Sequence, residues 1–246
     1  MKTSPLFTII FEDENIVAVN KASGISVGGD RWDESQERLD RLVAQAAALP
    51  AAAKIFIVHR IDRETSGLVV FAKNEVTHRE LSLAFEGRDV KKRYIAIVHG
   101  RPSWQETACD LPLVPNGNKQ HQTIIDKYQG KKSLTHFKLL GSAGNLSVLE
   151  SLPETGRTHQ IRVHAAALGF PVVCDLLYGK DKPVLLSAIK KNWRGDLLEE
   201  KPLLARLGLH AAELSLPSQT LCAPLPRDMA ALIKQMEKCG LGKFGD

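Results

Sequence analysis

The sequence predicts an α+β protein with a mixed, largely antiparallel β-sheet and flanking helices and loops. Short apolar runs typical of strands recur along the chain, and amphipathic stretches that fit helices lie between some of them. Strands and helices do not alternate regularly, as a parallel sheet would require. With 246 residues, 43% of them apolar, the chain can bury a core of its own. We therefore expect a single domain over residues 1–246.

In the first half of the chain, β-rich runs bounded by turn residues predict four strands. These runs are residues 7–11, 16–20, 55–58 and 68–72. The first two form an opening hairpin, and a polar, weakly helical stretch separates them from the other two. The last two strands enclose a polar loop, His59–Gly67. A helix with an apolar face follows and ends at Gly87.

In the second half, the same patterns predict further strands and two helices. Strands are expected at residues 92–98, 134–140, 146–152 and 214–216. Residues 111–133 are polar and predict a loop of a length that is often functional or mobile. One helix is expected between an N-cap at Thr158 and Gly169, and an amphipathic helix that ends at Gly240 follows near the end of the chain.

The charge balance is compatible with a polyanionic partner. Lys and Arg total 33 against 28 acidic residues, which gives a net charge of +5. Basic residues gather at residues 91–93, 127–132 and 180–194. Any one of these clusters fits solvated surface, but three on one chain modestly favour nucleic acid.

Composition also argues against several other classes. The apolar start of the chain meets Glu12–Glu14 too early for a signal peptide, and no apolar run approaches the roughly 18 residues of a membrane span. We therefore expect a cytoplasmic protein with no membrane partner. The cysteines lack metal-ligand spacing, and the five-residue separation of His159 and His164 does not suit one helical face, so we predict no metal.

Two polar segments carry groups that can do chemistry. His59–Gly67 lies between apolar strands and contains Asp62, although an ordinary polar turn is an equal alternative there. Thr155–His164 straddles a helix start, where exposed N–H groups and the helix dipole attract an anion. A capped helix start alone would be ordinary.

Together these segments resemble the motifs of the RluA-type RNA pseudouridine synthases. The family's first motif, His-Arg-Leu-Asp followed two residues later by Thr-Ser-Gly, is matched by residues 59–67 with Ile61 in place of Leu. Its tyrosine motif is matched by residues 91–100. The motif Gly-Arg-Thr-His-Gln-Ile-Arg-Val-His is present unchanged at residues 156–164.

Shorter elements agree as well. Gly-Asp-x-x-Tyr-Gly is matched at residues 175–179, with Cys174 where glycine is usual. The resemblance extends over about residues 7–217 and implies the pseudouridine synthase catalytic fold. Many relatives carry an N-terminal accessory RNA-binding domain, and we expect none here because the chain starts close to the catalytic motifs.

The resemblance implies an isomerase that converts a uridine of structured ribosomal or transfer RNA into pseudouridine. The reaction breaks the bond from ribose C1′ to N1, turns the base over and joins C1′ to C5. No net redox change occurs, so no cofactor is expected. The resemblance makes Asp62 the catalytic carboxylate, which either attacks C1′ or takes a ribose proton.

Two further catalytic residues are implied by the resemblance. Arg162 supplies the guanidinium that keeps Asp62 ionised in a site without water, where burial alone would disfavour the charged form. Tyr94 stacks on the uracil, and its hydroxyl helps to remove the C5 proton.

RNA is the expected partner of a monomeric enzyme, and the target uridine must leave the base stack. Arg60 resembles the family residue that fills the vacated space. His59 fits either a phosphate contact or support of the site, and support is favoured. The expected contacts to RNA phosphates are Lys91, Lys92, Arg157 and His159.

Two other functions remain open. A glycosidase could cleave the same bond and release the base, but retaining glycosidases pair two carboxylates about 5 Å apart. Glu64 is the only other acid in the Asp62 loop. A catalytically silent RNA-binding module is the second alternative, and the presence of Asp62, Tyr94 and Arg162 argues against it. Free uracil would identify the first alternative, and turnover of uridine would exclude the second.

Overall fold

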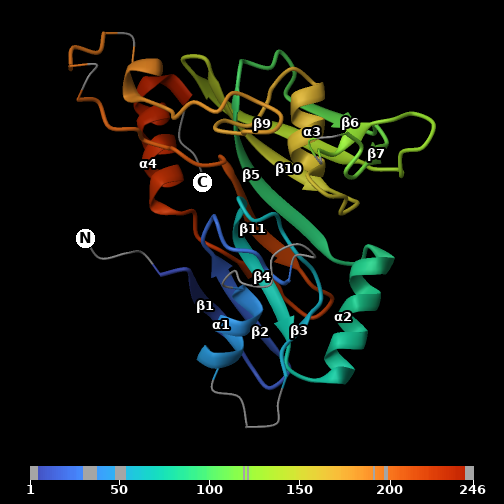
Figure 1. Ribbon diagram of the computed structural model, residues 1–246. Coiled ribbons are helices and arrows are strands. Elements are labelled where there is room, and N and C mark those ends of the chain that lie inside the picture. Colours follow the sequence, from blue (N-terminus) through green and yellow to red (C-terminus); the bar gives the residue numbers. More distant parts are fainter. Residues whose placement is uncertain are drawn as a thin grey trace. The chain divides into compact units, whose positions relative to one another are not determined.

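The strands and helices of this chain fall into two units, each with its own buried core (Figure 1). The computed structural model describes residues 5–29, 38–47, 54–118, 120, 122–190, 192–196 and 199–241. Unit 1 comprises Met1–Lys92 and His210–Pro224, and unit 2 comprises Arg93–Leu209 and Leu225–Asp246. The single domain expected over residues 1–246 stays a prediction.

Unit 1 is built around the buried strand β4 (Ser66–Ala72), whose seven residues are all buried. Its other elements are β1 (Phe7–Glu12), β2 (Ile16–Lys21), α1 (Leu39–Ala46), β3 (Phe56–Ile57), α2 (Glu75–Gly87), β11 (Leu209–Ser215) and β12 (Thr220–Cys222). The strand order is β1-β2-β4-β11, with β3 also paired to β4 and β12 paired to β11. All these pairs are antiparallel except β4 with β11.

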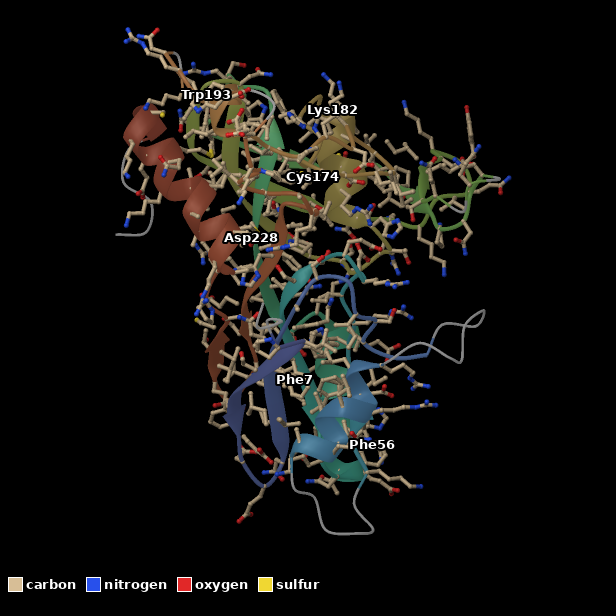
Figure 2. All side chains as sticks on the ribbon, turned by 60° about the vertical axis from the view of Figure 1, so that its left-hand side comes forward. Phe7, Phe56, Cys174, Lys182, Trp193 and Asp228 are labelled. Carbon is tan, nitrogen blue, oxygen red and sulfur yellow. The ribbon has the colours of Figure 1, made fainter. Side chains whose placement is uncertain are left out.

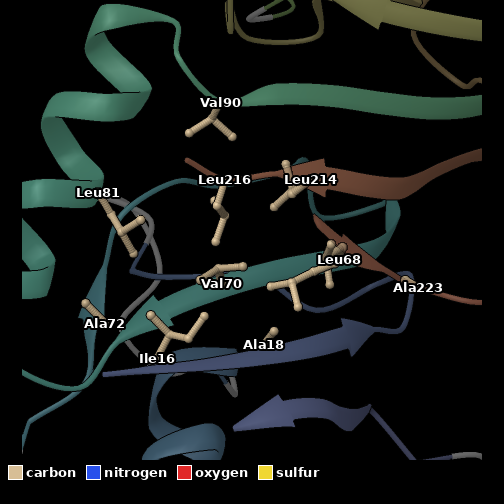
Figure 3. Close-up of a cluster of buried hydrophobic side chains, with 11 residues drawn as sticks. Ile16, Ala18, Leu68, Val70, Ala72, Leu81, Val90, Leu214, Leu216 and Ala223 are labelled. Atoms are coloured by element: carbon tan, nitrogen blue, oxygen red, sulfur yellow. The ribbon is translucent and has the colours of Figure 1, made fainter. Parts of the chain in front are cut away.

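The core of unit 1 forms where alternate residues of β4 meet apolar side chains of its neighbours (Figure 3). Leu68, Val70 and Ala72 project to the same side of the strand, as its two-residue period requires. The buried members of this cluster are Ile16, Ala18, Leu68, Val70, Ala72, Leu81, Val90, Leu214, Leu216, Leu221 and Ala223. Helix α2 contributes Leu81, and the helix ends at Gly87 as predicted.

Unit 2 has the strand order β5-β10-β9-β6, with antiparallel pairs between β10 and β5, β10 and β9, and β6 and β9. These strands are β5 (Lys91–His99), β6 (Glu106–Cys109), β9 (Thr135–Ala143) and β10 (Leu146–Pro153). The first two residues of β5 belong to unit 1. Helix α3 (Gln160–Ala167) buries Ile161 and Ala165 in the core that these strands form.

The remaining elements of unit 2 are a short hairpin and helical segments. They are β7 (Leu113–Val114), β8 (Ile124–Ile125), the 3-10 turn Leu186–Ala188, α4 (Arg227–Met236) and the final turn Glu237–Leu241. Helix α4 confirms the predicted amphipathic helix near the end of the chain. Its buried residues are Met229, Leu232, Ile233 and Met236.

The predicted α+β class with a mixed, largely antiparallel arrangement is confirmed. Several details were wrong. The strand expected at residues 214–216 is β11, which begins at Leu209, and the last helix ends at Met236 rather than at Gly240. Residues 111–133 contain the β7–β8 hairpin rather than loop alone, and β6 and β12 were missed, because strands of two to four residues give too little periodicity to detect. The N-cap of α3 is His159, with a left-handed φ of 54°, and not Thr158. Within the described residues, no helix is long and apolar enough to cross a membrane.

Candidate active site

The loop that carries Asp62 joins β3 to β4 and is held by the end of the opening hairpin. Lys21, the last residue of β2, is fully buried. Its Nζ donates to the carbonyl oxygens of Ala22 at 2.9 Å, Ile25 at 2.9 Å and Arg63 at 3.0 Å. A buried ammonium needs such acceptors, so the backbone next to Asp62 is fixed by Lys21.

Further bonds connect the same two segments. Arg63 donates from Nε to the carbonyl of Gly24 at 2.9 Å, and Gly24 N donates back to the carbonyl of Arg63 at 2.8 Å. Ser23 Oγ donates to the carbonyl of Glu64 at 2.6 Å. The Glu64 residue itself is exposed. The turn Lys21–Gly24 therefore acts as a clamp on the Asp62 loop.

The Thr-Ser-Gly end of the motif sets the approach of β11 to β4. Gly67 has a φ of 117°, and a Cβ placed there would lie 2.2 Å from the carbonyl oxygen of Ala211. Beside it, Ser66 Oγ and His210 Nδ1 are 3.0 Å apart, and His210 Nε2 is 3.2 Å from the carbonyl of Ala223. A carbonyl only accepts, so Nε2 carries the proton and Nδ1 accepts from Ser66.

His59 supports the loop from within unit 1. Its Nε2 accepts the backbone N–H of Val70 at 3.0 Å, and its ring stacks on Phe85 with centroids 4.6 Å apart. Burial lowers the pKa of His59 to about 3, with a smaller contribution from the charge of Lys92. The ring is therefore neutral, which agrees with the favoured role as support.

The expected RNA contacts of unit 1 differ in exposure. Arg60 and Lys91 are exposed, and Lys92 is half-buried. Burial lowers the pKa of Lys92 to about 8, and the positive charges of Arg88 and Lys91 act in the same direction. Lys92 therefore loses part of its charge in mildly alkaline solution.

Tyr94 lies in unit 2, on β5 opposite Ser151 of β10. It is half-buried and packs against the core cluster that includes Ile161 of α3. Arg93, the preceding residue, forms an ion pair with Glu150 on β10. The strand pairing and the ion pair fix the backbone at Tyr94.

Arg162 forms a buried, bidentate ion pair with Asp175. Its Nε and Nη2 each donate at 2.8 Å to one oxygen of the carboxylate, and the two side chains are 3% and 0% exposed. Asp175 also accepts the backbone N–H groups of Leu177 at 2.9 Å and Tyr178 at 3.1 Å. Burial acts to raise the pKa of Asp175, but the hydrogen bonds and charge of Arg162 outweigh it and keep that pKa below its usual range.

Tyr178 connects this ion pair to the start of α3. The guanidinium carbon of Arg162 lies 5.2 Å from the centre of the Tyr178 ring, a cation–π contact. The Tyr178 hydroxyl accepts the backbone N–H of Thr123 at 2.8 Å and lies 2.8 Å from Nδ1 of His159. His159, expected as a phosphate contact, is thus also part of the packing around Arg162.

Two other polar residues of the same motif are internal. Gln160 accepts at Oε1 from Thr155 Oγ1 at 2.6 Å and donates from Nε2 to Thr135 Oγ1 at 2.9 Å. Thr135 Oγ1 lies 2.9 Å from Nδ1 of His164, whose Nε2 lies 2.9 Å from the carbonyl of Leu111. Burial lowers the pKa of His164, which favours the neutral ring. Gln160 and His164 therefore hold α3 against β9.

Cys174 stands where relatives have glycine, and its backbone is left-handed, with a φ of 55°. Figure 2 labels the side chains of Cys174 and Lys182. The Cys174 Sγ contacts the backbone carbonyls of Lys182 at 3.3 Å and Leu204 at 3.6 Å. Cys174, the residue before Asp175, therefore has a backbone conformation that glycine adopts more easily than cysteine.

Each unit thus holds part of the predicted site. Unit 1 carries Asp62 and the expected RNA contacts Arg60, Lys91 and Lys92. Unit 2 carries Tyr94, Arg162, Arg157 and His159. Sequence reasoning did not assign roles to Asp175 and Tyr178, although their Asp-x-x-Tyr-Gly element was noticed. No cluster of three potential metal ligands occurs among the residues that the structure describes.

Comparison with known proteins connects this arrangement to a family. Residues 15–167 match a family model described as RNA pseudouridylate synthase. Ribosomal large subunit pseudouridine synthase D of Zymomonas mobilis is 33% identical over 239 residues, which cover 93% of this chain and 72% of the relative. Dual-specificity RNA pseudouridine synthase RluA of Vibrio vulnificus is 36% identical over 219 residues, 87% of this chain and 78% of the relative.

Solved structures show the same fold. Human RNA Pseudouridylate Synthase Domain Containing 4 has a TM-score of 0.73 and 23% identity, with 93% of this chain and 92% of that chain covered. Human RNA Pseudouridylate Synthase Domain Containing 1 has a TM-score of 0.71 and 24% identity, with 99% and 100% covered.

Proposed function

This chain belongs to the RNA pseudouridylate synthase family, with relatives of the RluA type, and we propose that it isomerises a uridine of structured RNA with Asp62 as catalytic carboxylate. The observation that carries the proposal is the family match over residues 15–167, which includes Asp62, Tyr94 and Arg162 within their motifs. The enzyme is accordingly an isomerase.

Asp62 acts at ribose C1′. In one route the carboxylate attacks C1′, uracil leaves through N1, and C5 of the turned base then displaces the carboxylate. In the other, the carboxylate takes a ribose proton as the base leaves, and the resulting glycal regains that proton as C1′ joins C5. In both routes C5 then loses its proton, N1 gains one and the carboxylate is regenerated, so atoms and electrons balance without a redox partner.

The clamp on the Asp62 loop supports this role. A catalytic carboxylate must be held in place before substrate binds, because misplacement by about 1 Å can reduce the rate about a hundredfold. Lys21 and Ser23 fix the backbone on the C-terminal side of Asp62, at Arg63 and Glu64. His59 fixes the N-terminal side by its bond to Val70.

Arg162 and Tyr94 complete the proposed machinery. The guanidinium has five N–H donors, and the pair with Asp175 uses Nε and Nη2. That pair, together with the Tyr178 ring, holds the guanidinium plane in one orientation. The stabilisation of ionised Asp62 by Arg162 remains a proposal, as does the stacking of Tyr94 on the uracil.

The RNA substrate is proposed to be a ribosomal or transfer RNA stem-loop. The names of the relatives specify the ribosomal large subunit or dual specificity, which supports this range of substrates. Arg60 enters the space that the flipped uridine leaves. The proposed phosphate contacts are Lys91, Lys92, Arg157 and His159. We also propose that the enzyme acts as a monomer, in the cytoplasm.

The decisive experiment compares Asp62→Asn with Glu64→Gln in the same loop. Unmodified bacterial ribosomal and transfer RNA transcripts are incubated with each protein, and pseudouridine and free uracil are quantified. Asp62→Asn should abolish isomerisation while RNA affinity stays within a few fold. Glu64→Gln should retain activity, because its exposed carboxylate has no part in the reaction.

Two results would overturn the proposal. Residual activity of Asp62→Asn above about a hundredth of wild type would remove Asp62 from the catalytic role, since loss of a nucleophile normally costs far more. Release of free uracil, with loss of that release in Glu64→Gln, would identify a glycosidase with a pair of carboxylates instead.

A further inference from the structure

A short turn between β8 and β9 places one aromatic side chain almost wholly in solvent. Tyr128 is 98% exposed, whereas Tyr94 and Tyr178 of the same unit are half-buried. The turn, Asp126–Gly130, lies in the segment 111–133, whose length and polarity predicted a functional or mobile loop. The reaction proposed above gives Tyr128 no role.

The backbone of this turn is fixed by its own hydrogen bonds. Asp126 Oδ1 accepts the backbone N–H groups of Tyr128 at 2.8 Å and Gln129 at 3.0 Å, and Gly130 N donates to the carbonyl of Asp126 at 2.9 Å. A Cβ at Gly130 would lie 2.6 Å from the carbonyl carbon of Pro112, so the close approach there requires glycine. The exposed ring is thus displayed on an ordered support.

The strands at the two ends of the turn are paired to the same residue. Leu113 pairs with Ile125 before the turn and forms a bridge with Lys131 after it. Thr123, at the start of this small sheet, donates its backbone N–H to the Tyr178 hydroxyl beside Arg162. The turn is therefore connected within unit 2 to the buried ion pair.

Positively charged residues lie close to Tyr128 in the sequence. Lys127, Lys131 and Lys132 are all exposed, and the one acid of the turn, Asp126, is engaged by backbone N–H groups. Arg157 donates from Nε to the carbonyl of Lys132 at 3.2 Å. The basic turn is thus continuous with a residue already proposed to contact RNA phosphate.

We propose that Tyr128 stacks on an unpaired base of the RNA substrate while Lys127, Lys131 and Lys132 contact the neighbouring phosphates. An aromatic ring among cations is the arrangement that binds single-stranded nucleic acid, because every base presents a π face and every linkage a phosphate. The contact is separate from the flipped uridine and selects RNA that presents an additional unpaired nucleotide. This inference rests on the proposed function.

The test uses Tyr128→Phe, Tyr128→Leu and Tyr128→Ala in the full chain, with the same unmodified RNA transcripts. Dissociation constants and single-turnover rates at saturating RNA are measured. Tyr128→Phe should bind within about twofold of wild type. Tyr128→Leu and Tyr128→Ala should bind at least about fivefold more weakly, the lower limit for loss of one stacked base. The rate at saturating RNA should not change, because Tyr128 has no role in the proposed reaction. Thermal stability should not change, because the side chain is exposed.

Val76→Ala provides the matched control, since Val76 is 69% exposed on α2 and belongs to none of the proposed contacts. Its RNA affinity should equal that of wild type. A transcript with 2-aminopurine at unpaired positions gives a direct readout. Stacking quenches its fluorescence on binding to wild type, and Tyr128→Leu should lose that quenching at one position.

Three outcomes would overturn the inference. If Tyr128→Ala bound RNA as tightly as wild type, Tyr128 would be an ordinary surface side chain. If Tyr128→Leu and Tyr128→Phe bound RNA equally well, the contact would be apolar and would not involve stacking. Normal binding of free RNA with weaker modification of ribosomal particles would indicate a protein contact instead. If wild type isomerises RNA and Tyr128→Ala does so with the same affinity, this inference alone fails; if wild type isomerises no RNA, the proposed function fails.

Discussion

At the scale of single residues, two buried charges among the described residues, Lys21 and Arg162, are each held by several hydrogen bonds. Lys21 donates to three backbone carbonyls, and Arg162 is paired with Asp175. Removing a charge from water costs several kcal/mol, so each buried ion requires such partners. The consequence is that residues without any part in the chemistry fix the backbone next to Asp62 and the side chain of Arg162.

The buried ion pair predicts a large loss of stability in Asp175→Asn. The variant keeps the shape of the side chain but removes the charge of Asp175 beside the buried Arg162. We expect the free energy of unfolding to fall by about 3–5 kcal/mol, the usual cost of removing one partner of a buried pair. Urea denaturation of the variant and wild type measures this difference.

Asp228→Asn is the control for that measurement. Arg206 and Asp228 form the same bidentate geometry, with distances of 2.7 and 2.6 Å, but their side chains are 22% and 36% exposed. Asp228 is labelled in Figure 2. A pair in contact with water contributes about 0–1 kcal/mol. Equal losses in the two variants would show that burial does not decide the strength of the Arg162 pair.

His59 predicts a pH dependence of stability. Its pKa is about 3 in the folded chain and 6.5 as the ordinary value, so the unfolded chain binds more protons between these values. Stability is therefore full above pH 6.5 and decreases as the pH falls toward 3. The variant His59→Gln keeps an acceptor for the Val70 N–H. Between pH 6.5 and 4, the free energy of unfolding of this variant should fall by up to about 3 kcal/mol less than that of wild type. Denaturant titrations at several pH values measure this, and identical pH profiles would contradict it.

At the scale of elements, the strand β4 connects the core to the Asp62 loop. All seven of its residues are buried, and it pairs with β2, β3 and β11. Its first two residues, Ser66 and Gly67, are also the end of the catalytic motif. The Asp62 loop is thus attached directly to a strand whose residues are all buried.

The close approach of β4 and β11 predicts that Gly67→Ala is severely destabilising. The new Cβ would meet the Ala211 backbone at 2.2 Å, in addition to the strain of a side chain at a φ of 117°. We expect a loss of more than about 3 kcal/mol, the sum of typical costs for left-handed strain and overpacking. Thermal and urea denaturation measure it.

Gly169→Ala separates the two causes. Gly169 has a φ of 89°, and a methyl group added there would meet nothing within 4 Å, so only the backbone strain applies. The expected loss is about 1–2 kcal/mol. If the two alanine variants were equally stable, contact with Ala211 would not be the reason for glycine at position 67.

At the scale of the whole molecule, the net charge of +5 is modest for a protein that binds a polyanion. Only a few phosphate contacts are therefore expected, with the remaining recognition coming from the shape of a folded stem-loop and an extrudable uridine. Lys191, in one of the basic segments, lies outside the described residues, so the structure adds nothing about it.

This charge predicts a shallow dependence of RNA affinity on salt. Each neutralised phosphate contributes a slope of roughly 0.9 for duplex and 0.7 for single strands in a log–log plot. The double reversal of Lys91 and Lys92 to Glu should lower the slope by about one or two units without changing which uridine is modified. Filter binding over a range of salt concentrations measures the slope.

Reversing Lys234 and Lys238 to Glu, near the end of the chain, changes the net charge by the same amount. Lys234 and Lys238 are exposed residues of α4 and of the turn after it. This variant should keep the wild-type slope more closely than the Lys91 and Lys92 variant. Affinity that is insensitive to salt in wild type would contradict electrostatic contacts altogether.

The residue order alone was sufficient to identify the family and to predict most of the strands and helices. Long runs such as β2, β4, β5 and α4 were predictable, because apolar periodicity over five or more residues reports directly which face is buried. The motifs that contain Asp62 and Arg162 could also be recognised from the sequence, because their residue types and order are specific to the family. The two-residue strands β7 and β8 could not, because they are too short for periodicity and are defined by their pairing in space.

Only the tertiary structure decided which residues support the site and how. The ion pair of Arg162 with Asp175, the clamp of Lys21 on the Asp62 loop and the glycine contact with β11 each join residues that lie apart in the chain. All of these residues can be read from the sequence, but a hydrogen bond or a steric contact depends on the distance and direction between atoms in the folded chain. These quantities are fixed only when strands pair and the core excludes water.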